Sequence, residues 1–125
     1  MSKIEDGRRI IAELMGEEFL EKKIASRNSF NDVVQDYADE VCFGTVWARD
    51  GIDRKQRSIL NIAMLVALGR PNQLRSHVLG AINNGCTKEE LKEIILHCAV
   101  YAGLPAAIDG FRVAEEVLRE KGMME

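Results

Sequence analysis

The sequence predicts an all-α protein. Apolar residues recur at helical spacing in one segment after another, and alternation typical of strands is almost absent. Residues suited to helix starts, such as Pro71, Thr87 and Pro105, stand where several of these segments begin. No internal repeat, low-complexity tract or interdomain linker interrupts the pattern, so we expect one compact domain over residues 1–125 with about six helices.

The first two predicted helices are the least sharply defined. Residues 4–15 form a modest amphipathic helix, which Gly16 and a segment of mixed charge up to Arg27 follow. Asn28 or Ser29 is suited to cap the next helix, and Gly44 lies near its end. Its apolar residues at helical spacing are Phe30, Val33, Val34, Tyr37 and Val41.

The next two helices have clearer ends. Asp53 is suited to cap a helix that runs to about Leu68, and from Ile59 onward Asn61 is its only polar residue. We expect this helix to be buried on most sides, either centrally in the domain or partly against another subunit. Residues 71–83 then form a helix with proline in its first turn, which ends at Asn-Asn-Gly.

The last two helices begin with strong local signals. Thr87 and Glu90 have the spacing of a capping box, and Pro105 opens the final helix. Leu96 and Val100 make a second side of the fifth helix apolar, which favours oligomerisation. The inward faces are predicted to be Leu91, Ile94, Ile95, Cys98 and Ala102 in the fifth helix and Phe111, Ala114 and Leu118 in the sixth.

Composition excludes several classes of function. The net charge is −3, from 17 basic and 20 acidic residues scattered along the chain, so there is no electrostatic footprint for nucleic acid or an anionic membrane. The chain has neither the order of a signal peptide nor an apolar run long enough to span a bilayer, and we expect a cytoplasmic protein. Cys42, Cys86 and Cys98 lack CxxC spacing, which argues against disulfides or a zinc site.

One histidine stands in an unusual place. His77 falls on the apolar stripe of its helix, in step with Leu74, Val78, Ala81 and Ile82. Either it is a core histidine with a hydrogen-bonding partner, or it serves the chemistry of a site.

Other polar and aromatic residues are weaker candidates. Trp47 and Arg49 share a predicted loop, where they either bind a ligand or plug the core and pair with an acid. Arg57 can bind a carboxylate through its fork, or it can bond to a carbonyl or to Asp53. Tyr101 either points its hydroxyl into a cleft or is an ordinary core tyrosine. His97 follows Glu93 by one helical turn and is expected at the surface.

Taken together, residues 44–111 resemble the carboxymuconolactone decarboxylase family, within the alkylhydroperoxidase D-like superfamily. The motifs that carry the resemblance are Gly-Thr-Val-Trp-Ala-Arg-Asp-Gly-Ile-Asp-Arg from Gly44, Arg-Ser at 57–58, Leu-Arg-Ser-His at 74–77, Asn-Gly-Cys-Thr-Lys-Glu-Glu at 84–90 and Val-Tyr-Ala-Gly-Leu-Pro-Ala-Ala at 100–107. The resemblance implies a compact helical domain that assembles as a homohexamer, a trimer of dimers, with sites near the subunit contacts.

The resemblance further indicates the decarboxylase branch. Peroxidase-like members have a CxxC pair before the helical histidine and a glutamate in the preceding helix. Here the two cysteine positions hold Arg70 and Gln73, and the glutamate position holds Ser58. Two residues depart from the decarboxylase pattern, because Thr45 replaces an acidic residue and Asp50 replaces a proline.

The decarboxylase branch implies an enzyme of aromatic-compound catabolism that needs no cofactor and no metal. The expected substrate is 4-carboxymuconolactone or a related small carboxylated lactone or oxo acid. Arg49 and His77 are the predicted catalytic residues, and Trp47, Arg57 and Tyr101 are predicted to bind the substrate. A peroxidase-like thiol antioxidant and a non-catalytic oligomeric ligand-binding protein remain the alternatives.

Overall fold

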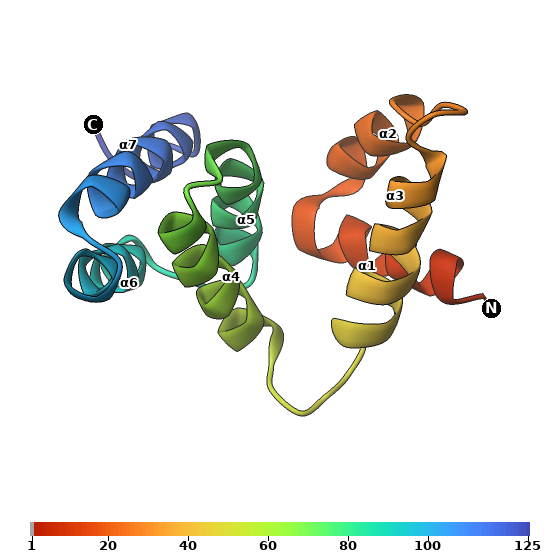
Figure 1. The fold of residues 1–125 in the computed structure, drawn as a ribbon, viewed down its shortest axis with the longest axis horizontal. Coiled ribbons are helices and arrows are strands. Elements are labelled where there is room, and N and C mark those ends of the chain that lie inside the picture. Colours follow the sequence, from red (N-terminus) through yellow and green to blue (C-terminus); the bar gives the residue numbers. More distant parts are fainter. Residues whose placement is uncertain (1) are drawn as a thin grey trace. The chain divides into compact units, whose positions relative to one another are not determined.

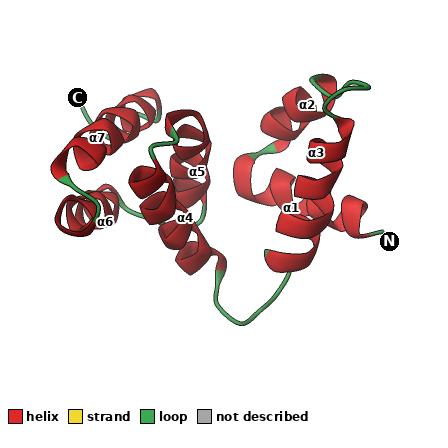
Figure 2. Ribbon diagram, in the orientation of Figure 1, coloured by secondary structure: helices red, strands yellow, loops and turns green. Residues whose placement is uncertain are grey.

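The computed structural model describes residues 2–125, in which all regular structure is helical, as the sequence predicts (Figures 1 and 2). The helices form two compact units, one ending at Asp53 and the other running from Arg54 to Glu125. Each unit has its own hydrophobic core. The single domain expected from the sequence stays a prediction.

The first unit contains one helix that the sequence did not reveal. Its elements are α1 (Lys3–Met15), α2 (Glu17–Ala25), α3 (Asp32–Tyr37) and the π-helix η1 (Ala38–Val46), which continues directly from α3 (Figure 1). Helix α2 lies in the segment of mixed charge and has no fully buried residue. It therefore lacks the apolar periodicity from which a helix is recognised.

Close backbone contact between α1 and η1 organises this unit. A side chain at Gly7 would collide with the carbonyl oxygen of Asp39, and one at Gly44 would collide with the carbonyl oxygen of Lys3. The Asp39 carboxylate is 2% exposed and accepts hydrogen bonds from Arg8 Nε at 3.1 Å and Lys23 Nζ at 2.6 Å. Two cations thus neutralise the buried charge where the helices meet.

The apolar residues of the α3 segment face solvent. Phe30 is 92% exposed, and Val33, Val34 and Tyr37 are each more than half exposed. The side of η1 that meets α1 is occupied by Asp39 and Gly44 instead. Helical spacing thus revealed a helix here, although it did not reveal which side of that helix is covered.

The second unit follows the predicted element order closely. It consists of α4 (Arg54–Leu68), α5 (Pro71–Asn83), α6 (Lys88–Tyr101) and α7 (Leu104–Glu120). The Thr87 hydroxyl accepts a hydrogen bond from the Glu90 amide at 3.0 Å, and the Glu90 carboxylate accepts one from the Thr87 amide at 3.0 Å. The capping box predicted at the start of α6 is therefore confirmed.

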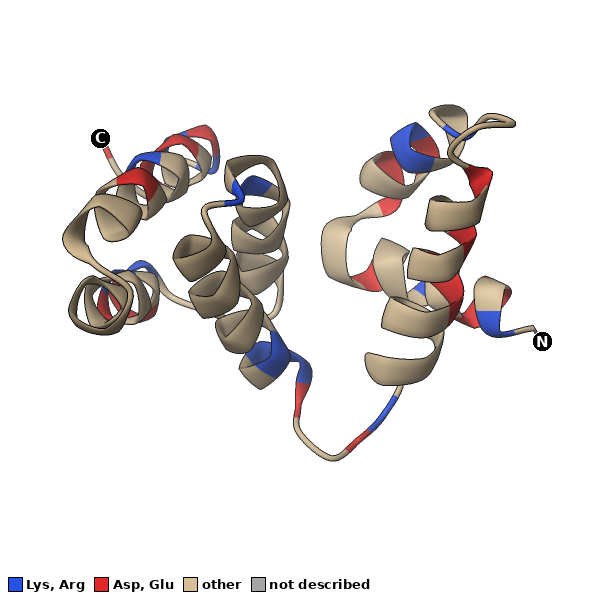
Figure 3. Ribbon diagram, in the orientation of Figure 1, with Lys and Arg blue, Asp and Glu red and all other residues tan. Residues whose placement is uncertain are grey.

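Helix α4 is in contact with each of the other three helices of this unit. Ser58, Ile62 and Val66 form its buried side, whereas Leu60, Met64 and Leu68 are at least half exposed. Within the described chain α4 is therefore covered on one side, and the expected burial on most sides would require contact with another subunit. Figure 3 shows charged residues only at the first turn of α4, so most of its exposed surface is uncharged.

Helix α7 closes the core and is linked to α5 by charge. Gly110 lies so close to Val66 that a methyl group there would approach the valine side chain to 2.9 Å. Arg75 of α5 forms an ion pair with Glu120 of α7 at 2.5 Å.

No helix within residues 2–125 combines the length and the apolar character needed to cross a bilayer.

The contact at Gly7 leads to a stability prediction. Gly7→Ala should lower the free energy of unfolding of the first unit by about 3 kcal/mol, because the added methyl group meets backbone that cannot rotate away. Fluorescence of Trp47 during urea denaturation measures this, since Trp47 is the only tryptophan and lies in the core of that unit. Gly51→Ala is the matched control, with open space around the new methyl group and an expected change within about 0.5 kcal/mol. Equal stability of the two variants would contradict the prediction.

Candidate active site

His77 lies on α5 where the sequence places it. Leu74, Val78 and Ala81 of the same stripe are buried, and His77 itself is half-buried. The amide nitrogen of Asn61, on α4, lies 3.3 Å from His77 Nδ1. The structure thus gives the inward histidine a specific hydrogen-bonding partner on the neighbouring helix.

This environment favours the uncharged imidazole. Burial lowers the pKa of His77 below the usual value of 6.5. The Asn61 amide nitrogen carries only donor hydrogens, so Nδ1 accepts the hydrogen bond. A neutral imidazole with an acceptor at Nδ1 carries its proton on Nε2.

Arg57 lies in the first turn of α4 and is partly buried. Its Nε atom is buried and has no hydrogen-bond partner among the described residues. Buried polar atoms in proteins nearly always have a partner, and an orphaned donor calls for an acceptor. The next residue, Ser58, is 1% exposed and accepts a hydrogen bond from Asn84 Nδ2 at 2.9 Å.

Trp47 and Arg49 lie at the end of the first unit. Trp47 is 7% exposed, belongs to a core cluster with Ile11 and Leu14, and stacks on Phe43 with 6.0 Å between ring centroids. Arg49, two residues later, is exposed. Trp47 is therefore a core residue, which is one of the two alternatives expected from the sequence. It anchors the start of the segment that carries Arg49.

Tyr101 is the last residue of α6 and is 80% exposed. Its ring packs against His97, with 4.8 Å between the centroids. Both aromatic rings therefore lie on the surface of the second unit. The five predicted site residues are thus divided, with Trp47 and Arg49 in the first unit and Arg57, His77 and Tyr101 on three helices of the second.

The cysteines are poorly suited to thiol chemistry. Cys86 and Cys98 are 3% and 6% exposed, and burial raises the pKa of both thiols. Cys98 Sγ also lies 3.8 Å from the carbonyl oxygen of Ala63, to which it donates a weak hydrogen bond. Only the thiolate is a good nucleophile, so these two environments disfavour a peroxide-reducing role. Cys42 on η1 is exposed.

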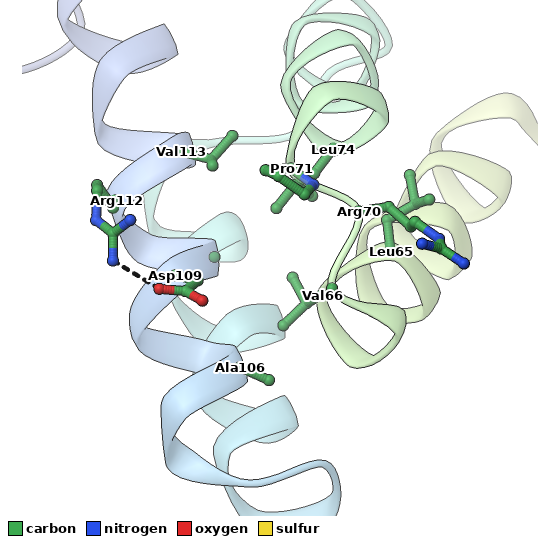
Figure 4. Close-up of a pocket in the computed structure, with 11 residues that line it drawn as sticks. Leu65, Val66, Arg70, Pro71, Leu74, Ala106, Asp109, Arg112 and Val113 are labelled. Atoms are coloured by element: carbon green, nitrogen blue, oxygen red, sulfur yellow. Dashed lines mark hydrogen bonds and ion pairs between the residues drawn. The ribbon is translucent and has the colours of Figure 1, made fainter.

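A small cavity of about 120 Å³ lies between α7 and the α4–α5 connection (Figure 4). Apolar side chains such as Val66, Leu74 and Val113 form much of its wall. Arg112 forms an ion pair with Asp109 at 2.6 Å, and Arg70 points away from the cavity (Figure 4). None of the five predicted site residues is among the described residues that line it. This cavity is therefore separate from the predicted site residues.

Sequence reasoning did not assign roles to two amides of the second unit. Asn61 was visible as the only polar residue between Ile59 and Leu68, and that isolation was the available signal. Asn84 stood in a turn motif that gave no hint of its hydrogen bond to Ser58. Both partners depend on how helices meet in space, which helical periodicity along one segment does not specify.

Comparison with known proteins places this chain in a family. A model of the carboxymuconolactone decarboxylase family matches residues 33–116. The chain belongs to the carboxymuconolactone decarboxylase family. It is 43% identical over 117 residues to 4-carboxymuconolactone decarboxylase of Acinetobacter baylyi, covering 94% of this chain and 87% of that protein. The family resemblance carried by residues 44–111 is therefore confirmed.

Two other relatives are also similar to this chain, and one of them is named for a different acid. Over 116 residues the chain is 34% identical to nitrosuccinic acid decarboxylase of Metarhizium robertsii, covering 93% of this chain and 81% of that protein. An uncharacterized 15.0 kDa protein of Paracoccus denitrificans is 36% identical over 85 residues, which cover 66% of this chain and 63% of that protein. Members of the carboxymuconolactone decarboxylase family thus include decarboxylases named for two different carboxylic acids.

The lowered pKa of His77 predicts how stability depends on pH. In the unfolded chain His77 binds a proton near pH 6.5, whereas the folded chain resists protonation until lower pH. The contribution of neutral His77 is therefore complete above about pH 6.5 and is lost as the pH falls through the folded value. Urea denaturation from about pH 8 to about pH 5 should show a steeper loss for the parent than for His77→Asn. His97→Asn, at an exposed position, is the control, and parallel curves for parent and His77→Asn would contradict the prediction.

Proposed function

We propose that this protein is a cofactor-independent decarboxylase acting on 4-carboxymuconolactone or a related small carboxylated lactone or oxo acid. The observation that carries the proposal is the buried, unpartnered Nε of Arg57, a donor suited to a carboxylate oxygen. The names of two relatives support carboxyl loss as the reaction type. Because those names specify different acids, the substrate is proposed as a class.

The reaction can proceed without an added electron sink. The bond between the ring carbon and the carboxylate breaks, carbon dioxide leaves, and the bonding electrons flow through the conjugated ring to the lactone carbonyl oxygen. The resulting dienolate then takes up one proton at a ring carbon, which regenerates a neutral lactone ring. The protein must orient the substrate, stabilise the developing oxyanion and exclude competing reactions.

We assign the roles as follows. Arg49 and Arg57 hold the substrate carboxylates, and His77 acts at the reacting ring. Tyr101 contributes to the wall of the substrate site, and Trp47, buried in the core of the first unit, positions the segment that carries Arg49. Thr45 stands where the family pattern has an acidic residue, and its hydroxyl donates to the Glu40 carbonyl oxygen at 2.9 Å. It thus cannot supply a carboxylate, which favours a substrate that differs in its acidic groups.

Turnover of 4-carboxymuconolactone, generated in situ, tests this function. Ultraviolet absorbance and released carbon dioxide should show activity in the parent and a loss of about 100-fold or more in His77→Asn. Arg57→Leu should raise KM by about tenfold or more, because a charge-assisted bond to the substrate is lost. Arg112→Ala, which removes an exposed arginine paired with Asp109, is the matched control.

Two results would count against the proposal. A folded parent that releases no carbon dioxide from carboxylated lactones or oxo acids would overturn the function. Full turnover by a folded His77→Asn variant would overturn the assigned site instead.

We further propose that the chain assembles with copies of itself, as a homohexamer arranged as a trimer of dimers. Exposed apolar residues support the assembly, because surfaces of this kind are unusual on monomers. On α6 and the start of α7 they are Leu96, Val100, Tyr101, Leu104 and Ile108, and Val100 is 76% exposed.

A charge placed within this surface should weaken assembly. Val100→Glu should lower the molar mass measured by light scattering after size exclusion, because the carboxylate would have to be desolvated in the interface. Lys121→Glu, a charge change at an exposed position outside the patch, should leave the mass unchanged. A monomeric parent would contradict the proposal, and an unaffected Val100→Glu oligomer would show that another surface is used.

A further inference from the structure

Asn61 is the only polar residue of α4 between Ile59 and Leu68, and the proposed function assigns it no role. We propose that Asn61 is a positioning residue that holds the proton of His77 on Nε2, so that His77 serves the reaction as a hydrogen-bond donor to the developing oxyanion. The inference rests on the proposed decarboxylase function and decides between two roles for His77. The other role is delivery of a proton to the ring carbon.

The geometry between the two helices carries this inference. Asn61 of α4 directs its amide nitrogen to Nδ1 of His77 on α5 at 3.3 Å. Since the amide nitrogen can only donate, Nδ1 must offer its lone pair, and the single proton of a neutral imidazole lies on the opposite nitrogen. A fixed donor of this kind needs no reorganisation when negative charge develops on a substrate oxygen.

The surroundings of Asn61 show that its amide is not needed for packing. From Ile59 to Leu68 every other residue of α4 is apolar, and Ile62 and Val66 supply the core contacts. Leucine has the same number of side-chain heavy atoms and the same branching as asparagine, and it would bring no polar group to satisfy. The amide is therefore best explained by what it does to His77.

The proton inventory of the reaction agrees with this role. A neutral His77 that gave its Nε2 proton to carbon would be left as an imidazolate, an anion that burial disfavours. In the proposed step His77 keeps its proton and donates a hydrogen bond to the lactone carbonyl oxygen as the carboxyl bond breaks. Water then supplies the proton to the ring carbon and is left as hydroxide, so that the substrate carboxylate and one water become carbon dioxide, the protonated ring and hydroxide.

Nitrogen NMR of the imidazole rings tests the tautomer directly and without any substrate. The chain has two histidines, so the exposed His97 serves as an internal reference. At a pH where the rings are neutral, the parent should show a protonated Nε2 and an unprotonated Nδ1 on His77. Asn61→Asp should reverse this pattern, because a carboxylate accepts the proton at Nδ1, and Asn61→Leu should give a mixture. Asn72→Asp, the same change at an exposed position of α5, should leave the parent pattern intact.

Turnover measured at the same pH connects the tautomer to catalysis. Asn61→Asp should lower kcat by roughly 100-fold with little change in KM, because the oxyanion loses its donor while the carboxylate contacts remain. Asn61→Leu should lie between Asn61→Asp and the parent, and it provides the test if the aspartate variant does not fold.

The outcomes separate this inference from the proposed function. A parent with its proton on Nδ1, a Leu variant with the parent tautomer, or an Asp variant with full kcat would each overturn the role of Asn61 while leaving the decarboxylase intact. A parent with the expected tautomer and no turnover of any carboxylated lactone or oxo acid would overturn the decarboxylase and, with it, the oxyanion role of His77.

Discussion

The packing of α4 is the constraint on which the second unit depends. A single side of this helix, made by Ser58, Ile62 and Val66, fills the space between three other helices. These residues recur every four positions, so they fix the rotation of α4 about its axis. That rotation in turn places Asn61 on the side of α4 that meets His77 of α5. The core and the surroundings of His77 are therefore consequences of one helix orientation, and neither can be shifted without the other.

The helices were predictable where their signals are local. Pro71, Thr87 and Pro105 marked helix starts because proline geometry and capping hydrogen bonds involve only neighbouring residues. Helix α2 was missed because it has no fully buried residue, which left little periodicity to detect. The π-helical geometry of η1 was not predictable either. It accompanies the close approach of Gly44 to α1, which is distant in the sequence.

The candidate site was predictable to the extent that single residues stand out from their neighbours. The inward position of His77 followed from the apolar stripe around it, and the structure supports that position. Its bond to Asn61 required knowledge of how two helices cross. Arg57 was expected to bond either to a ligand or within the chain, and its unpartnered Nε now favours the ligand. Tyr101 is no core residue, because it lies on the surface of the second unit against His97, and its place in a substrate site stays a prediction.

Ser58 restricts the evolutionary paths open to this protein. The peroxidase-like relatives suggested by the sequence resemblance have a glutamate at this position, in addition to two cysteines at positions 70 and 73. Here the serine hydroxyl is enclosed and bonded to Asn84, so a glutamate would bring extra volume and a charge into filled space. Restoring the two cysteines alone would therefore not recreate a peroxidase. A return to that chemistry would also require a remodelled contact between α4 and the end of α5.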